Sequence, residues 1–218
     1  SRTDLSGQLG GIGLRGPGET QLESDRRLLR VRVKQIKNRL EKVRNQRQLA
    51  RRSRQRADIP GVSLVGYTNT GKSTLFNFLT ESQVFAADQL FATLDPTVRR
   101  VEIPNLGAVT LADTVGFIRH LPHKLVEAFR ATLEESASAD LLLHVIDAQS
   151  PERAEQIKQV HNVLQEIDAD KVPMLEVYNK IDLLDNVDPH IQRDEHGKPI
   201  RVWISAQKQQ GIALLQQA

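Results

Sequence analysis

The sequence predicts an α/β protein whose doubly wound, mostly parallel sheet is preceded by a glycine-rich loop and a long basic helix. From residue 59 onward, apolar segments of strand length alternate with helical segments, which is typical of a parallel sheet. A glycine-rich turn joins the first of these strands to a helix. Charge divides the chain, because residues 1–58 carry 16 Lys and Arg against 6 Asp and Glu, and residues 59–218 carry 14 against 21. We therefore expect two domains, 1–58 and 59–218.

Residues 1–58 are expected to be part of an N-terminal domain. Six glycines and a proline within residues 7–18 predict a flexible segment that holds neither a helix nor a packed strand. A helix is predicted from Thr20 to about Arg56, with Thr20 as its N-cap and Glu23 completing a capping box. Apolar residues with a/d spacing then predict pairing with another long helix. These are Leu22, Leu29, Val33, Ile36, Leu40 and Val43.

The other faces of this predicted helix are strongly basic. Residues 26–56 contain fourteen Lys and Arg, and Glu41 is the one acid among them. A solvated helix face usually mixes charge signs, because like charges one turn apart repel. We therefore infer a polyanionic partner, and a narrow apolar stripe favours RNA over a membrane surface. A bland solvated face, and a simple linker for residues 7–18, are the alternatives.

The second domain is predicted to alternate strands and helices. Strands are expected at 62–66, 99–103, 109–113, 141–147, 174–178 and 200–204, and helices at 72–79, 125–135, 154–166 and from near Gly211. Ligands of such sheets bind at the carboxyl ends of the strands. The chain has no cysteine, no apolar run of transmembrane length and no N-terminal signal pattern, so a cytoplasmic protein is expected.

Residues 66–73 read Gly-Tyr-Thr-Asn-Thr-Gly-Lys-Ser and match the phosphate-loop pattern G-x-x-x-x-G-K-[ST]. A strand before the loop and a helix after it aim backbone N–H groups and the helix dipole at one phosphate site. Lys72 is expected to reach the β- and γ-phosphates and Ser73 to bind Mg²⁺. Thr70 stands where we expect a smaller residue such as Ala. The nucleotide-contact candidates here are Gly66, Tyr67, Thr68, Asn69, Thr70, Gly71, Lys72, Ser73 and Thr74.

Two short runs at predicted strand ends complete a nucleotide site. Asp113, Thr114, Val115 and Gly116 form a D-x-x-G run, in which the carboxylate suits Mg²⁺ binding through water and the Gly116 N–H could sense a γ-phosphate. Asn179, Lys180, Ile181 and Asp182 form an N-K-x-D run. Asp182 can accept hydrogen bonds from the N1–H and 2-amino groups of guanine, which adenine lacks. We expect Asn179 to brace the phosphate loop and the Lys180 stem to cover the ring.

Two further segments are candidates because of their position. Ser205, Ala206 and Gln207 end the last predicted strand, where the Ala206 N–H could donate to the guanine 6-oxygen. A switch segment needs a hydroxyl that binds Mg²⁺ only while the γ-phosphate is present. Thr93 and Thr97 both qualify. The candidate contacts of this segment are Phe91, Ala92, Thr93, Leu94 and Asp95.

The motif order G-Y-T-N-T-G-K-S, F-A-T-L-D, D-T-V-G, N-K-I-D and S-A resembles that of the translation-factor-related P-loop GTPases. The segment G-G-I-G-L-R-G-P-G-E-T-Q-L-E-S-D-R-R with its basic helix resembles the HflX family of ribosome-associated GTPases. This resemblance implies GTP/GDP and Mg²⁺ as cofactors, with Ser73, Thr93 and Asp113 (through water) at the metal. It also implies a fragment that lacks most of the N-terminal domain and the C-terminal domain, and that stops inside its last helix.

The same resemblance implies a partner and an activity. Members bind the large ribosomal subunit and can split ribosomes under stress, so the basic helix and glycine-rich loop, with Arg15, are expected to contact ribosomal RNA in a monomer. Lys72, Thr93 and Gly116 are the catalytic candidates. Phe117 occupies the position after D-x-x-G where many GTPases carry a water-orienting Gln, so hydrolysis is expected to be slow without ribosomes. An RNA-binding module with a structural nucleotide site and a membrane-recruited GTPase are the alternatives.

Overall fold

The computed structural model describes residues 17–56, 59–80, 97–114, 116–117, 133 and 136–218. The chain divides into two compact units, Ser1–Ser53 and Arg54–Ala218.

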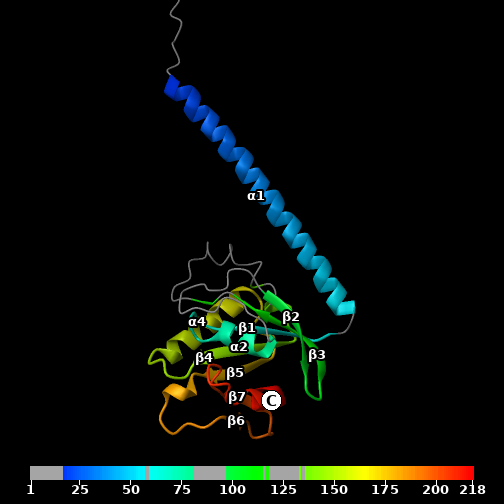
Figure 1. Cartoon of the computed structure of the whole chain (residues 1–218), viewed down its shortest axis with the longest axis vertical. Coiled ribbons are helices and arrows are strands. Elements are labelled where there is room, and N and C mark those ends of the chain that lie inside the picture. The colour runs from blue at the N-terminus through cyan, green and yellow to red at the C-terminus, as the bar shows by residue number, and fades with distance from the viewer. Residues whose placement is uncertain (1–16, 57–58, 81–96, 115, 118–132, 134–135) are drawn as a thin grey trace, which may run out of the picture. The chain divides into compact units, whose positions relative to one another are not determined.

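The first unit is built on one helix, α1, which spans Pro17–Arg56 and is 40 residues long (Figure 1). It begins three residues before Thr20, so the predicted N-cap at Thr20 and its capping box with Glu23 are wrong. Proline is tolerated in the first turn, where no backbone N–H is needed for the helix. The expectation that residues 7–18 hold no helix is therefore also wrong for Pro17 and Gly18.

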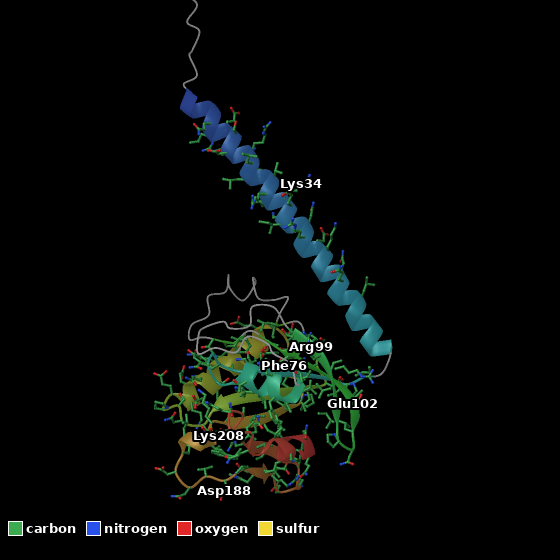
Figure 2. The ribbon with its side chains drawn as sticks, viewed as in Figure 1. Lys34, Phe76, Arg99, Glu102, Asp188 and Lys208 are labelled. Atoms are coloured by element: carbon green, nitrogen blue, oxygen red, sulfur yellow. The ribbon has the colours of Figure 1, made fainter. Side chains whose placement is uncertain are left out.

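Residues 21–39 of α1 are all exposed. Leu22, Leu29 and Ile36 of the predicted seam are each more than half exposed. Basic side chains such as Lys34 project from the same helix (Figure 2). Helices of soluble proteins owe most of their stability to burying one face, but the apolar residues described in α1 form an exposed stripe.

The second unit contains a seven-stranded sheet with the order β2-β3-β1-β4-β5-β7-β6. The five inner strands are parallel, and β2 and β6 are antiparallel edges. The strands are β1 Gly61–Val65, β2 Thr97–Ile103, β3 Gly107–Asp113, β4 Leu141–Asp147, β5 Met174–Asn179, β6 His190–Arg193 and β7 Pro199–Trp203. The predicted fold class is confirmed. Strand β6 was not predicted, because its four residues are mostly exposed and polar.

Helices cover both faces of the sheet. They are α2 Lys72–Thr80, α4 Arg153–Glu166, the short 3₁₀ helix η1 Ile181–Leu183 and α5 Ile212–Gln217. Helices α2 and α5 bury Phe76 and Ile212 in one core cluster with Leu143 and Val177 of the sheet. Helix α4 buries Val160 on the opposite face of the sheet, in a second core cluster with Val65 of β1 and Leu142 of β4. The predicted helix 125–135 lies outside the described residues except for Leu133.

Because the inner strands are parallel, their carboxyl ends lie together along one side of the sheet, the sheet edge. Asp113 ends β3, Asp147 ends β4 and Asn179 ends β5, and β1 ends at Val65 between β3 and β4. Ligands of doubly wound sheets bind at this edge.

Candidate functional site

The loop at residues 66–73 connects the buried strand β1 to helix α2. Gly66 has a φ of 155°, and a side chain there would collide with the backbone carbonyl of Val145 on β4. Gly71 has a φ of 91°, and a side chain there would collide with the amide of Asn179. The two glycines thus let the loop lie directly on the ends of β4 and β5, which positions the N-terminus of α2 at the sheet edge.

Lys72 lies inside this loop and is only 6% exposed. Its ammonium donates to the carbonyl oxygens of Tyr67 at 3.0 Å and Gly66 at 3.3 Å. Burial lowers its pKa from 10.5 to about 8, and the nearby charge of Asp113 partly opposes that shift. The loop therefore holds a desolvated cation that a phosphate oxygen would stabilise.

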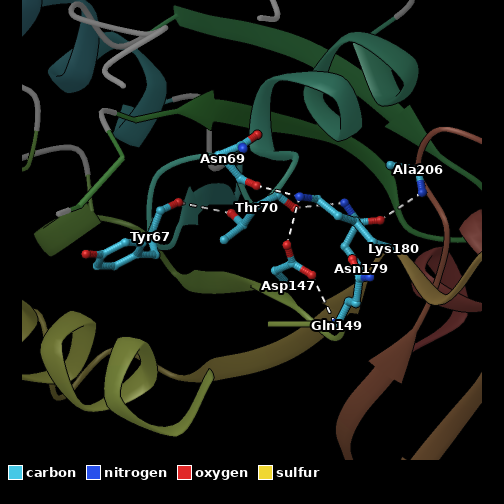
Figure 3. A network of polar contacts seen from close by, with 8 residues as sticks. All are labelled: Tyr67, Asn69, Thr70, Asp147, Gln149, Asn179, Lys180 and Ala206. Atoms are coloured by element: carbon cyan, nitrogen blue, oxygen red, sulfur yellow. Dashed lines mark hydrogen bonds and ion pairs between the residues drawn. The ribbon is translucent and has the colours of Figure 1, made fainter. Parts of the chain in front are cut away.

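Thr70 turns its hydroxyl inward. The side chain is 2% exposed, and its Oγ1 donates to the Tyr67 carbonyl at 3.1 Å (Figure 3). A buried hydroxyl needs such a partner. The hydroxyl that made this position unusual in the sequence thus closes a turn of the loop.

Ser73 and Asp113 meet at the start of α2. The Ser73 Oγ donates to Asp113 Oδ2 at 2.8 Å, and Asp113 is fully buried at the end of β3. A hydroxyl and a carboxylate beside a phosphate loop are the hard oxygen ligands that Mg²⁺ prefers. The residues present therefore fit a magnesium ion.

The residues after Asp113 are tied to the phosphate loop. Thr114 donates from Oγ1 to the Leu64 carbonyl at 2.7 Å. A Cβ on Gly116 would lie 3.0 Å from both Lys72 Nζ and Thr68 Cα, so this close approach favours glycine. The Phe117 N–H donates to Gly66 and its carbonyl accepts from Thr68, at 3.0 and 2.7 Å.

The Phe117 ring is buried in the core. It is 1% exposed and belongs to the core cluster that contains Val160 of α4. Burying an aromatic ring is worth several kcal/mol, so the ring anchors the D-x-x-G segment while its backbone pairs with the loop.

Asn179 links three segments of the edge. Its Nδ2 donates to the Thr70 carbonyl at 2.9 Å, and its Oδ1 accepts from the Ala206 N–H at 2.9 Å (Figure 3). The Ala206 N–H, expected to face a guanine 6-oxygen, is thus engaged by Asn179 in this structure. A buried N–H costs free energy without an acceptor, and Asn179 supplies one.

Lys180 extends across the edge with a left-handed backbone, at φ 69°. Its ammonium donates to the Asn69 carbonyl at 2.7 Å and to Asp147 Oδ2 at 2.8 Å. Sequence reasoning missed Asp147, because a lone acid at the end of an apolar strand belongs to no motif.

Asp182 is held by Ser205. The Ser205 hydroxyl donates to Asp182 Oδ1 at 2.5 Å and accepts from the Lys208 N–H at 3.1 Å. Ile181 is 1% exposed and belongs to the core cluster with Tyr178. Ile181 therefore anchors the N-K-x-D turn to the core. Gln207, the last residue of the predicted Ser205–Gln207 segment, is exposed.

The structure thus brings most of the candidate residues to one edge. The phosphate loop meets the D-x-x-G run through Ser73 and Gly116, and the N-K-x-D run through Thr70 and Asn69. The remaining candidates lie outside the described residues. These are Phe91, Ala92, Thr93, Leu94, Asp95 and Val115.

Within the described residues, no helix is long and apolar enough to cross a membrane. In the same part of the chain, no group of three or more His, Cys, Asp or Glu side chains is arranged to hold a metal ion. The Ser73–Asp113 pair differs from such a group because a hydroxyl supplies one ligand.

Comparison with known proteins agrees with this geometry. A family described as "50S ribosome-binding GTPase" matches residues 61–180, and one described as "GTP-binding GTPase Middle Region" matches residues 1–54. The GTPase HflX of Escherichia coli K12 is 63% identical over 216 residues, which is 99% of this chain and 51% of that protein. The chain therefore spans about half the length of the curated relatives it matches.

Solved structures of GTP-binding proteins are also similar to this chain. A GTP-binding protein from Sulfolobus solfataricus in complex with GDP is 31% identical with a TM-score of 0.56, covering 78% of this chain and 54% of its own. Era in complex with MgGDPNP and a 16S ribosomal RNA segment is 26% identical with a TM-score of 0.55, covering 72% and 54%. The family match to residues 61–180 and the 63% identity to an HflX GTPase over 99% of the chain show that the chain belongs to the HflX family of GTPases.

Proposed function

We propose that this chain binds and hydrolyses GTP as a molecular switch. The observation that carries the proposal is that one sheet edge holds both the Ser73–Asp113 pair, 2.8 Å apart, and the Asn179 bridge between the Thr70 carbonyl and Ala206. The first arrangement suits a phosphate–magnesium group and the second lies beside Asp182, which suits guanine. Family membership supports the same activity.

Each segment has a separate role in this proposal. Lys72 and the N–H groups of the loop hold the phosphates, while Ser73, Thr93 and Asp113 (through water) hold Mg²⁺. That ion, when bound, neutralises charge on the β- and γ-phosphate oxygens. The Gly116 N–H responds to the γ-phosphate, and Asp182 reads guanine with a carboxylate that Ser205 orients.

Phe117 suggests that hydrolysis depends on a partner. An apolar ring cannot orient a water molecule by hydrogen bonding, and this ring is buried in the core. We propose that the ribosome supplies or orders the missing catalytic element. Single-turnover GTP hydrolysis is expected to accelerate when large ribosomal subunits are added. Equal rates with and without subunits would contradict the ribosome dependence, and no turnover in either condition would favour a structural nucleotide site.

The partner is proposed to be the large ribosomal subunit. The basic residues of α1 are exposed where they are described, and a polyanion would neutralise them. Ribosome splitting or rescue under stress, in the cytoplasm, is the function that this pairing serves. A footprint on ribosomal RNA with a non-hydrolysable GTP analogue should protect large-subunit RNA in a manner that depends on α1. Co-sedimentation of the protein with anionic vesicles, in competition with RNA, would instead favour membrane recruitment.

A further inference from the structure

Asp147 lies at the end of β4 and belongs to none of the nucleotide motifs. One of its carboxylate oxygens, Oδ1, accepts from the Gln149 N–H at 3.0 Å. The other, Oδ2, pairs with Lys180 Nζ at 2.8 Å (Figure 3). The turn after β4 thus fixes the carboxylate in one orientation, and the free oxygen receives the lysine.

Lys180 is held between two elements that are far apart in the sequence. Its second acceptor is the carbonyl of Asn69, 2.7 Å away in the phosphate loop. Asn69 and Lys180 both have left-handed backbones, with φ of 59° and 69°. One ammonium therefore joins the loop after β1 to the ends of β4 and β5.

This ion pair is partly shielded from water. The side chains of Lys180 and Asp147 are 25% and 18% exposed. A fully exposed pair contributes little, whereas a partly desolvated pair that also makes hydrogen bonds contributes more. Without Asp147, the Lys180 ammonium would keep one neutral acceptor, and its flexible stem would regain rotamers that it loses here.

We propose that Asp147 is a positioning residue that holds Lys180 in place and thereby sets how long a guanine nucleotide stays bound. The inference rests on the proposed guanine-nucleotide function. The Lys180 stem then already lies, before the nucleotide binds, where it will cover the base ring. Less conformational entropy of Lys180 is therefore lost on binding. The phosphate loop also stays tied to the base-reading turn through Asn69.

This role is distinct from reading the base. Asp182 is oriented by Ser205 rather than by Lys180, so its preference for guanine does not depend on Asp147. A change at Asp147 should shorten the residence of GDP and of xanthosine diphosphate by the same factor. The ratio of the two affinities should stay constant.

The test uses Asp147→Asn, which keeps an acceptor for the Gln149 N–H but removes the charge that Lys180 meets. Release of a fluorescent GDP analogue, followed by stopped flow, is expected to be about tenfold faster than in the parent chain. The matched control is Asp170→Asn, an exposed acid just before β5, at the opposite edge of the sheet, with the same charge change. Unchanged release in Asp147→Asn would overturn the proposal.

A double-mutant cycle separates positioning from a general structural effect. In a Lys180→Met background, which keeps an apolar stem, Asp147→Asn should no longer change the release rate. The same acceleration in both backgrounds would show that Asp147 acts by another route. Thermal unfolding of the nucleotide-free variants checks folding, and if Asp147→Asn does not fold, faster release at higher salt in the parent but not in Lys180→Met is the deciding measurement.

Failure of the proposed function would look different. The parent chain would then not retain the GDP analogue at all. Release from the parent with no effect of Asp147→Asn would contradict only the positioning role.

Discussion

The two units of this chain differ in where their side chains find partners. In the α/β unit, the polar groups at the sheet edge bond to one another, as the Asn179 amide does with Thr70 and Ala206. In α1, residues 21–39 are all exposed, and they include apolar Leu22 and Leu29. The polar groups of the α/β unit are thus largely paired with one another, whereas the described part of α1 presents exposed apolar and basic side chains.

This difference implies that the two units have separable functions. Changes at the sheet edge should alter nucleotide binding and leave polyanion binding intact, and changes in α1 should do the reverse. A single-site variant that altered both nucleotide binding and polyanion binding would contradict this separation.

The largest effect is expected at Asp182. Asp182→Asn replaces one of the two carboxylate acceptors that face the guanine N1–H and 2-amino groups with an NH2 donor, and leaving a guanine donor unpaired is costly. GDP affinity should fall roughly a thousandfold, and xanthosine diphosphate should become the better ligand. Isothermal titration calorimetry measures both.

The matched control for this variant is Asp185→Asn, an exposed acid three residues further on. It makes the same charge change and should bind GDP as the parent chain does. Unchanged GDP affinity in Asp182→Asn would refute the assignment of base recognition.

The next effect is expected in α1. Replacing Arg26, Arg27 and Arg30 by Gln should weaken RNA binding roughly 10- to 100-fold at low salt, because fewer counterions are released. The slope of log affinity against log salt should flatten by about 2. Fluorescence anisotropy with a large-subunit RNA fragment at several salt concentrations measures the slope.

The control removes the same charge from the other unit. Replacing exposed Lys158, Lys171 and Lys198 by Gln should leave the slope unchanged. Equal flattening in both triple variants would mean that net charge, rather than α1, attracts the RNA.

The sheet and most of the edge could be predicted from the sequence because their signals are local. Asp113 and Asn179 each follow an apolar strand, and parallel strands bring their ends to one edge. Strand β6 could not be predicted, since its four residues carry neither an apolar run nor alternation strong enough to distinguish it from a loop. Its place depends on pairing with β7.

Two other failures have different causes. The start of α1 differs from the prediction because the Thr20–Glu23 spacing fits a capping box, while the helix already begins at Pro17, a residue type whose ring favours the first turn. Asp147 was missed because its meaning comes from Lys180, which lies on another strand and approaches only in the folded sheet. A pair of this kind has no sequence spacing to recognise.

A smaller effect is expected from the titration of Lys72. Its pKa is lowered to about 8 by burial, so the free protein loses this charge as the pH rises through 8. Bound phosphate favours the charged form and raises the pKa again. Between pH 7 and pH 9, GDP affinity should therefore fall about tenfold.

Proton uptake checks this prediction directly. Binding at pH 8.5 should take up roughly 0.8 proton, against about 0.1 at pH 7. Calorimetry in two buffers of different ionisation enthalpy measures the uptake. Equal uptake at both pH values would mean that Lys72 carries a full charge before the nucleotide binds.

The smallest effect concerns His144, in the middle of β4 and 1% exposed. Its Nδ1 has no hydrogen-bond partner among the described residues. Burial, His161 of α4 and Lys72 of α2 together lower its pKa from 6.5 to about 3. The folded protein thus keeps this ring neutral at a pH where the unfolded chain protonates it.

The sign of the pH dependence follows from this lowered pKa. The free energy of unfolding is unaffected by the protonation of His144 well above pH 6.5. It decreases as the pH falls from 6.5 toward 3, because the unfolded state then binds a proton that the folded state does not. Between pH 7 and pH 5.5 the loss is about 1.2 kcal/mol. Urea unfolding at both pH values should show this loss in the parent chain and a smaller one in His144→Leu, which places an apolar group of similar size there. A His144→Leu variant as pH-sensitive as the parent would assign the acid sensitivity to other groups, and nucleotide binding at pH 7 provides the check that the sheet edge is intact.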